Sequence, residues 1–215
     1  MTTSEENYLK VIYHLSMVSP KGVNTNAIAG MLETKASSVT DMLKKLADKE
    51  LVIYKKYQGA LLTEKGTINA KMIVRKHRLW EVFLVEKLNF TWDEVHEIAE
   101  ELEHIKSEKL INKLDSFLNY PEFDPHGDPI PNKDGEIKKL QKQLLSDANS
   151  NVSYTCVGVK DSSPEFLQYL DKQKIALGSI FKIIEKDAFD DILHIEINNK
   201  KLTISNKIAS NLYVK

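Results

Sequence analysis

Three short stretches of helical periodicity, followed at once by two β-rich runs, open the sequence and restrict its fold more than any other feature. Apolar residues recur with a helical period over residues 5–17, 24–32 and 37–49. The β-rich runs lie within LVIYKKYQGALLTEKG and join near Gly59, where glycine supplies the backbone freedom that a hairpin turn needs. Three helices and a hairpin predict a winged helix-turn-helix, with Thr3 or Ser4 as the cap of the first helix.

The next segments predict a helical layer. Residues 67–88 have more apolar positions than a surface helix requires, so this helix needs a partner. A second helix is expected to begin near Asp93, because Thr91 and Glu94 have capping-box spacing, and a third covers residues 107–118. Such a layer can mediate dimerisation. Its candidate interface residues are Trp80, Phe83 and Phe117, and core packing is the alternative for each.

The last part of the chain changes character. Residues 121–135 contain four of the six prolines and predict a loop, and residues 136–146 predict a polar helix. Beyond them, strands are expected at 152–159, 179–185, 192–197 and 201–205 around a helix at 164–174, with a hairpin turn at Asn198 and Asn199. This pattern predicts a small β-barrel. Cys156 is the only cysteine, which excludes an internal disulfide, and its surroundings predict a buried side chain in a strand.

The predicted fold is therefore mainly α with small β parts. We expect a winged helix-turn-helix domain at 1–66, a helical dimerisation domain at 67–135, a linker at 136–150 and a small β-barrel at 151–215. No segment has the pattern of a secretory signal or a membrane span, so a cytoplasmic protein is expected.

Charge is distributed unevenly along the chain. Residues 1–80 contain 13 Lys and Arg against 7 Asp and Glu, whereas residues 81–120 contain 4 against 10. The basic part is suited to a polyanion and the acidic part to a cation, although solvated helix faces are the alternative for both.

The basic part carries a candidate DNA-binding face. Polar side chains on the third helix lie opposite Val39, Leu43 and Leu46, and such a helix can enter the major groove. A three-helix packing unit without a DNA role is the alternative. The expected DNA contacts are Thr34, Lys35, Ser37, Ser38, Thr40, Lys44, Lys45, Lys55 and Lys56.

The acidic part carries a candidate metal site. His96, Glu100, Glu103 and His104 have the spacing i, i+4, i+7 and i+8, which puts them on one helix face. His77 and Glu81 share a face of the preceding helix. A set of nitrogen and oxygen ligands without thiolates suits Mn(II) or Fe(II), although Zn(II) and Cu(II) bind such sets more tightly. For each residue alone, a solvated carboxylate or a hydrogen-bonded histidine is the alternative.

Two other function classes compete with a metal-dependent DNA-binding protein. A metallohydrolase would need a catalytic motif, and the sequence has no HExxH signature, no phosphate-binding glycine loop and no nucleophile beside a base, so no enzyme is predicted. A metal-independent winged-helix regulator would respond to an organic ligand instead.

The sequence also resembles a known family, the DtxR/MntR-type metal-dependent repressors that are related to the diphtheria toxin repressor. The resemblance covers residues 5–131 through SEENYLKVIYHL, ASSVTDMLKKLADKELV, LLTEKG, RKHRLWEVFLVEKL, VHEIAEELEH and DPHGDPIP. The C-terminal ALGSIFKI and final strands are similar to the family's FeoA-like barrel of Src-homology type. The resemblance implies a homodimer that represses metal-uptake genes by binding palindromic double-stranded operator DNA, with no membrane partner.

The resemblance also implies roles for the ligand residues. Asn7, Glu100, Glu103 and His104 occupy its primary metal site, while His77, Glu81 and His96 occupy an ancillary site. His77 also serves the main two-metal site of the manganese branch. Two positions depart from the family: Asn7 stands where the branches have Met or Asp, and Lys10 stands where the manganese branch has Glu. Glu100 stands where the iron branch has Cys, which favours manganese over iron.

Overall fold

The structure is a computed structural model that describes residues 1–56, 58–187, 189–197 and 200–215. The chain forms two compact units. Unit 1 consists of Met1–Trp80, Glu100–Leu114 and Pro131–Ile137, and unit 2 of Glu81–Ala99, Asp115–Ile130 and Lys138–Lys215.

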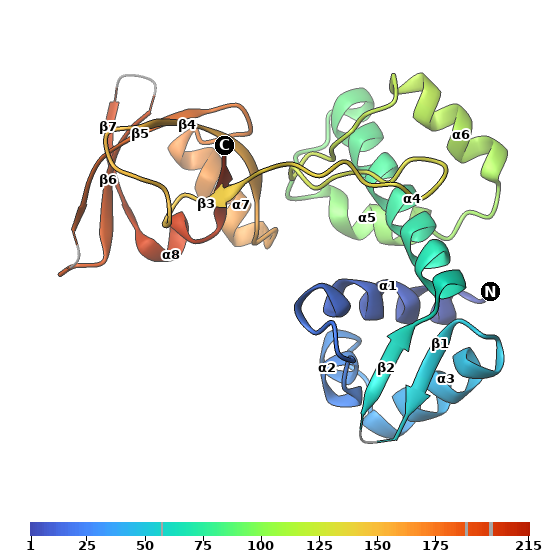
Figure 1. Ribbon diagram of the computed structural model, residues 1–215. Coiled ribbons are helices and arrows are strands. Elements are labelled where there is room, and N and C mark those ends of the chain that lie inside the picture. The colour runs from blue at the N-terminus through green and yellow to red at the C-terminus, as the bar shows by residue number, and fades with distance from the viewer. Residues whose placement is uncertain (57, 188, 198–199) are drawn as a thin grey trace. The chain divides into compact units, whose positions relative to one another are not determined.

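Unit 1 contains the winged helix-turn-helix that the sequence predicts (Figure 1). Its elements are α1 (Thr3–Val18), α2 (Thr25–Met31), α3 (Ala36–Asp48), β1 (Val52–Lys55) and β2 (Gly59–Leu62). β1 and β2 pair antiparallel, and Val23 adds a bridge to Ala60. Gly59 has φ +89°, and a Cβ there would lie 2.4 Å from the carbonyl oxygen of Val23, so glycine is required at this end of the wing.

The cap of α1 differs from the prediction by one or two residues. Thr2, rather than Thr3 or Ser4, is the N-cap, and it forms a capping box with Glu5. The backbone N–H of Thr2 donates to Glu5 Oε2 at 3.1 Å, and the backbone N–H of Glu5 donates to Thr2 Oγ1 at 3.3 Å. The capping box therefore satisfies two of the N–H groups that the start of α1 leaves free.

One apolar core joins the elements of unit 1. Leu9 and Ile12 of α1 are fully buried, as are Val39, Leu43 and Leu46 of α3. They pack in one cluster together with residues of the wing and of the following helix. Because α1 contributes a face to this core, its orientation is tied to that of α3.

The helical layer is confirmed, with one boundary corrected. α4 is Glu64–Leu88, α5 is Val95–Leu102 and α6 is Glu108–Phe117. α5 begins at Val95, two residues after Asp93. The Thr91 N–H donates to Glu94 Oε2 at 3.0 Å, within a turn that precedes the helix. α5 also ends at Leu102, so Glu103 and His104 lie in the turn that follows it and not on the predicted helix face.

The C-terminal part of unit 2 is the expected small β domain around one helix. Its strands form an antiparallel sheet in the order β3-β8-β4-β5-β6-β7. The elements are β3 (Gln143–Leu144), β4 (Ser153–Val159), α7 (Pro164–Gln173), β5 (Ile180–Asp187), β6 (Ile192–Ile197), β7 (Lys200–Ser205), α8 (Asn206–Ala209) and β8 (Leu212–Val214). Cys156 is 2% exposed in β4, as predicted.

The polar helix predicted at 136–146 is wrong. β3 pairs with β8 there, and the Leu145 N–H donates to the Leu212 carbonyl at 2.9 Å. Leu145 is fully buried, so pairing with a distant strand prevails over a local helical preference. α8 and β8 were not predicted. The turn predicted at Asn198 and Asn199 lies outside the described residues.

Within the described ranges, no helix is both long enough and apolar enough to span a bilayer.

Gly66 provides a test of the packing in unit 1. A Cβ at this position would lie 1.9 Å from the carbonyl oxygen of Leu51. Gly66→Ala should therefore destabilise the protein by about 1–3 kcal/mol, although alanine normally favours a helix. Gly30→Ala in α2 meets nothing within 4 Å and should be neutral or stabilising. Urea unfolding of both variants makes the comparison, and equal effects would contradict the packing described here.

Candidate metal centre

The carboxylate of Glu103 is the centre of a polar cluster in unit 1. Its side chain is 0% exposed. Glu103 Oε2 accepts from Lys10 Nζ at 2.7 Å and from His77 Nδ1 at 2.7 Å. The other oxygen, Oε1, is buried and has no hydrogen-bond partner among the residues that the structure describes. A buried carboxylate oxygen without a partner is costly, so Oε1 is suited to receive a cation.

His104 is oriented towards that oxygen. Its Nδ1 lies 2.7 Å from Glu6 Oε2 on α1. Because an ionised carboxylate only accepts hydrogen bonds, Nδ1 carries the hydrogen, and in the neutral imidazole Nε2 is left as a lone pair. His104 Nε2 lies 3.8 Å from Glu103 Oε1, a separation that two ligands of one ion with bonds near 2.1 Å can have. Carboxylates commonly orient metal-binding histidines in this way.

Asn7 supplies a second buried oxygen without a partner. Its Oδ1 has no hydrogen-bond partner among the described residues. Asn7 follows Glu6 on α1, and amide oxygens ligate hard cations. The side-chain types of Asn7, Glu103 and His104 therefore suit a divalent ion.

Lys10 occupies a second possible ion position, which lies on the Oε2 side of Glu103. His77, Glu100 and Glu103 offer ligand atoms that lie within 4.8 Å of one another. The ammonium of Lys10 lies among them, 2.6 Å from Glu100 Oε1 and 2.7 Å from Glu103 Oε2. Burial alone would raise the pKa of Glu103, but His77 and Lys10 hold it below its usual value. The Lys10 ammonium thus already neutralises the carboxylates at the position where a second ion would bind.

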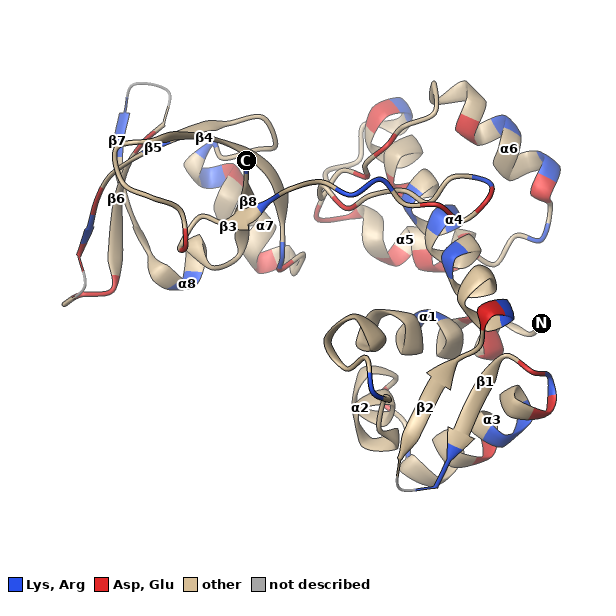
Figure 2. Cartoon of the chain, in the orientation of Figure 1, with Lys and Arg blue, Asp and Glu red and all other residues tan. Residues whose placement is uncertain are grey.

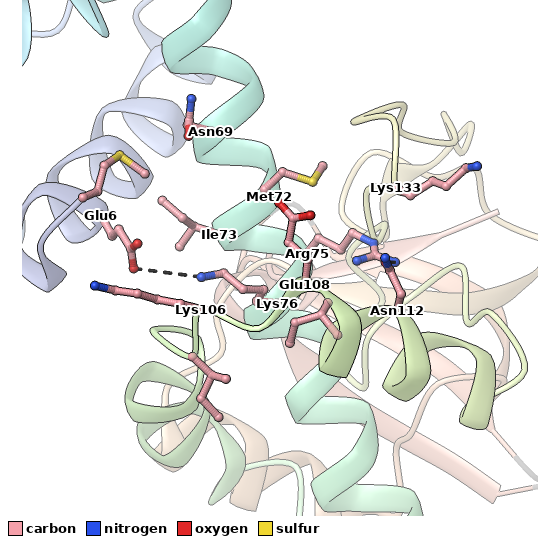
Figure 3. Close-up of a pocket in the computed structure, with 13 residues that line it drawn as sticks. Glu6, Asn69, Met72, Ile73, Arg75, Lys76, Lys106, Glu108, Asn112 and Lys133 are labelled. Carbon is pink, nitrogen blue, oxygen red and sulfur yellow. Dashed lines mark hydrogen bonds and ion pairs between the residues drawn. The ribbon is translucent and has the colours of Figure 1, made fainter. Parts of the chain in front are cut away.

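Glu6 connects this cluster to α4. Lys76 Nζ lies 3.9 Å from Glu6 Oε2, and Figure 3 shows the two side chains facing each other from α4 and α1. Both line a cavity of about 300 Å³ in unit 1. Burial lowers the pKa of Lys76 and exceeds the opposing effect of Glu6 and Glu103. Glu6 is not among the predicted ligand or positioning residues, because its role depends on contacts with residues far away in the sequence.

A second group of possible ligands lies in unit 2. Glu81, Asp124 and His126 are all buried, with ligand atoms within 4.8 Å of one another. His96, whose side chain is 55% exposed, places Nδ1 3.6 Å from Glu81 Oε1. Asp124 and His126 were not predicted as ligands. Their signal was the turn-rich DPHGDP segment, in which a histidine stands between two aspartates.

His126 also connects this group to the β domain. Its Nε2 lies 2.8 Å from the Trp92 carbonyl oxygen, and its Nδ1 lies 3.7 Å from Glu81 Oε1. The His126 carbonyl accepts from the Val159 N–H in β4 at 2.9 Å. Burial alone would lower the pKa of His126, but Glu81 and Asp124 raise it to about 9. His126 is therefore an imidazolium at neutral pH.

The predicted primary and ancillary sites are thus distributed over the two units. The structure brings Glu100 and Glu103 together with His77 in unit 1, where His104 also lies, and Glu81 together with His96 in unit 2. His77, predicted for both sites, donates to Glu103.

The predicted DNA-contacting residues lie on α3, in the turn before it and on the hairpin. All are exposed except Thr40, which is half-buried. Figure 2 shows Lys and Arg on α3 and near the end of β1. Lys45 has a second partner, because its Nζ lies 3.0 Å from Glu5 Oε1. A hydrogen bond from Lys49 and the proximity of Lys45 lower the pKa of Glu5 to about 2, despite burial.

Comparisons with known proteins cover most of the chain. A model described as the N-terminal DNA-binding domain of iron-dependent repressors matches residues 1–60, and one described as their metal-binding and dimerisation domain matches residues 63–132. A FeoA domain model matches residues 143–215.

Individual relatives agree with these models. The HTH-type transcriptional regulator MntR of Oceanobacillus iheyensis is 32% identical over 72% of this chain and 97% of that protein. A solved structure of a manganese-dependent transcriptional repressor in complex with manganese covers 98% of both chains, with 30% identity and a TM-score of 0.84. The chain also matches a probable metal transport system membrane protein of Chlamydia trachomatis serovar D at 43% identity, but it spans only 19% of that protein.

Removal of the Lys10 ammonium should open a further ion position. In Lys10→Gln, His77, Glu100 and Glu103 keep their ligand atoms but lose the internal cation, so the protein should bind one additional Mn(II) per chain. Equilibrium dialysis with metal analysis measures the difference from wild type. Lys109→Gln, an exposed lysine in α6, is the control. An unchanged stoichiometry would show that Lys10 does not occupy an ion position.

The pKa of His126 predicts a pH dependence of stability for the metal-free protein. Because folding raises this pKa to about 9, the contribution is complete below the unfolded value near 6.5 and is lost as pH rises through 9. Urea unfolding in chelator should show a loss of about 3 kcal/mol between pH 6.5 and 9.5. His126→Gln should remove most of this change, whereas His194→Gln should retain it. Equal pH dependence in wild type and His126→Gln would contradict the assignment.

Proposed function

The chain belongs to the DtxR/MntR-type family of metal-dependent transcriptional repressors, and on that premise we propose that Mn(II) or Fe(II), held by Asn7, Glu103 and His104, switches it to its DNA-binding form. We propose further that it acts in the cytoplasm as a homodimer on palindromic operators and represses metal-uptake genes. The family consists of DNA-binding regulators that control metal homeostasis.

One observation carries this proposal. Glu103 Oε1 is buried and has no hydrogen-bond partner among the described residues, while the ring of His104 is oriented by Glu6 so that Nε2 lies 3.8 Å away. A hydrogen-bonded core network would not leave Glu103 Oε1 in this state, because unpaired buried polar groups are rare. A cation at this point would pair with Oε1 and could take Nε2 as a second ligand.

The ligand types support manganese over iron. The set contains carboxylate, amide and imidazole but no thiolate, and Glu100 stands where the iron branch has Cys. Hard oxygen ligands favour Mn(II), whereas thiolates would favour softer ions. The solved structure with the TM-score of 0.84 is described as manganese-dependent, which agrees with this choice.

The proposed switch couples α1 to the turn after α5. A divalent ion would pair with the buried negative charge at Glu103 Oε1. Asn7 lies on α1, whose apolar face packs into the winged-helix core, and Glu103 and His104 lie in the turn. Ligands from both sides would hold α1, and α3 with it, in one orientation. In a dimer this fixes the spacing of two recognition helices, which must match two half-sites about one helical turn apart.

The residues proposed to meet DNA divide by chemistry. Hydroxyl groups of Ser37, Ser38 and Thr40 are suited to base edges, and the lysines of α3 and the hairpin to phosphates. Phe117, which is 60% exposed and lies with its ring 6.4 Å from that of Phe83, is a candidate dimer contact. Trp80, at 9% exposed, is a core residue of its helix instead.

The function can be tested with DNA that the protein itself selects. From a randomised duplex library, the full chain with Mn(II) should enrich a palindrome. Its affinity for that duplex should fall at least about tenfold in chelator, because metal and DNA strengthen each other's binding by the same factor.

His104→Ala distinguishes the competing classes. It should abolish the effect of Mn(II) on DNA affinity, while His194→Ala, which removes an imidazole of the β domain, should retain it. A metal-independent regulator would bind the selected duplex equally well in all of these states, and that result would end the proposal.

A further inference from the structure

Glu5 is a buried charge whose contacts are not explained by metal binding. Its side chain is 0% exposed, yet it lies on α1 one residue before Glu6. Lys49 Nζ donates to both of its oxygens, at 2.7 Å and 2.9 Å, and Lys45 Nζ lies 3.0 Å from Oε1. Both lysines are half-exposed, at 52% for Lys45 and 45% for Lys49. A single carboxylate therefore binds two cations one helical turn apart.

The two lysines belong to the end of the recognition helix. Lys45 lies in the last turn of α3 and Lys49 is its C-cap. Cations are favoured at a helix C-terminus, so this end of α3 is a natural place for the pair. Glu5 thus connects the first turn of α1 to the last turn of α3, inside unit 1.

Glu5 and Glu6 are adjacent and make different connections. Glu6 accepts from His104 of the candidate centre, and Glu5 binds the end of α3. The same turn of α1 is fixed at its start by the capping box of Thr2 and Glu5. Any displacement of this turn at the centre must therefore move or break the contacts with Lys45 and Lys49.

We propose that Glu5 is a positioning residue that transmits the state of the metal centre to the recognition helix, by holding the first turn of α1 and the last turn of α3 as one body. The inference rests on the proposed function. Apolar packing also joins α1 and α3, but the hydrophobic effect is not directional. A buried carboxylate between two ammonium groups fixes distance and direction, and salt screens it less than it screens exposed pairs.

A consequence concerns Lys45. With its ammonium on Glu5, Lys45 acts mainly in positioning α3, and the phosphate contacts fall to Lys35, Lys44 and the hairpin lysines.

The test uses the full chain and the duplex selected by wild type. For each variant, DNA affinity is measured with Mn(II) and in chelator, and Mn(II) affinity is measured separately without DNA. Glu5→Gln removes the charge but keeps a residue that is favoured in a capping box. We expect the ratio of the two DNA affinities to fall from at least about tenfold to about threefold or less, with Mn(II) affinity within about twofold of wild type.

Two control variants separate the effect of the Glu5–Lys45–Lys49 contacts from that of the other contacts in the first turn of α1. Thr2→Val removes the cap hydroxyl but leaves the lysine contacts, and Glu50→Gln removes an exposed carboxylate next to Lys49. Both should retain the wild-type ratio. Lys49→Gln should reproduce the loss, and combined with Glu5→Gln it should add little, because the two residues form one interaction. Lys49→Gln also serves if Glu5→Gln does not fold.

The outcomes are distinct. A wild-type ratio in both Glu5→Gln and Lys49→Gln would overturn the inference, as would an equal fall in Glu50→Gln. A purely structural defect would weaken DNA binding with and without Mn(II) alike, so that the ratio is kept, and it would overturn the inference too. If Mn(II) does not change the DNA affinity of wild type, the proposed function fails. If Mn(II) raises the DNA affinity of wild type and of Glu5→Gln alike, only the proposed role of Glu5 fails.

Discussion

The ionised carboxylate of Glu103, buried with no exposed surface, is the constraint on which the site depends. A charge in this environment is tolerated only if other groups neutralise it. Lys10 and His77 do so at Oε2, and Oε1 remains without a hydrogen bond among the described residues. The two oxygens thus have different tasks: one is held by the protein itself, and the other is available to a cation from solution.

The first helix, α1, carries residues that contact the candidate centre, the end of α3 and the apolar core. Within two turns it carries three residues with contacts far along the chain. Glu5 binds the end of α3, Glu6 orients His104, and Lys10 binds Glu103. Asn7, between them, has a buried side-chain oxygen without a hydrogen-bond partner among the described residues. The other face of the helix is buried in the winged-helix core through Leu9 and Ile12. One rigid element thus contributes to the core, to the candidate centre and to the contacts between Glu5 and the end of α3. In the proposed mechanism, a change in charge at Glu103 is transmitted along it to α3 by a small movement.

Periodicity predicted the winged helix-turn-helix, the helical layer and most strands of the small β domain, because each segment's apolar pattern matches its own period. It also placed Glu100 and His104 near Glu103 from spacing, although Glu103 and His104 lie in a turn and not on the helix. It could not predict the role of Glu6 or the pairing of Lys45 with Glu5, since these join residues that are about 40 or more positions apart. The strand at Gln143–Leu144 was missed for the same reason, because its partner is the last strand of the chain.

The central claim is that a single divalent ion connects α1 to the turn after α5. Anomalous scattering from crystals grown with Mn(II) tests it most directly. The account predicts one peak bonded to Asn7 Oδ1, Glu103 Oε1 and His104 Nε2, with Lys10 still on Glu103 Oε2. A peak held by other groups, with Asn7 remote from Glu103 and His104, would contradict it.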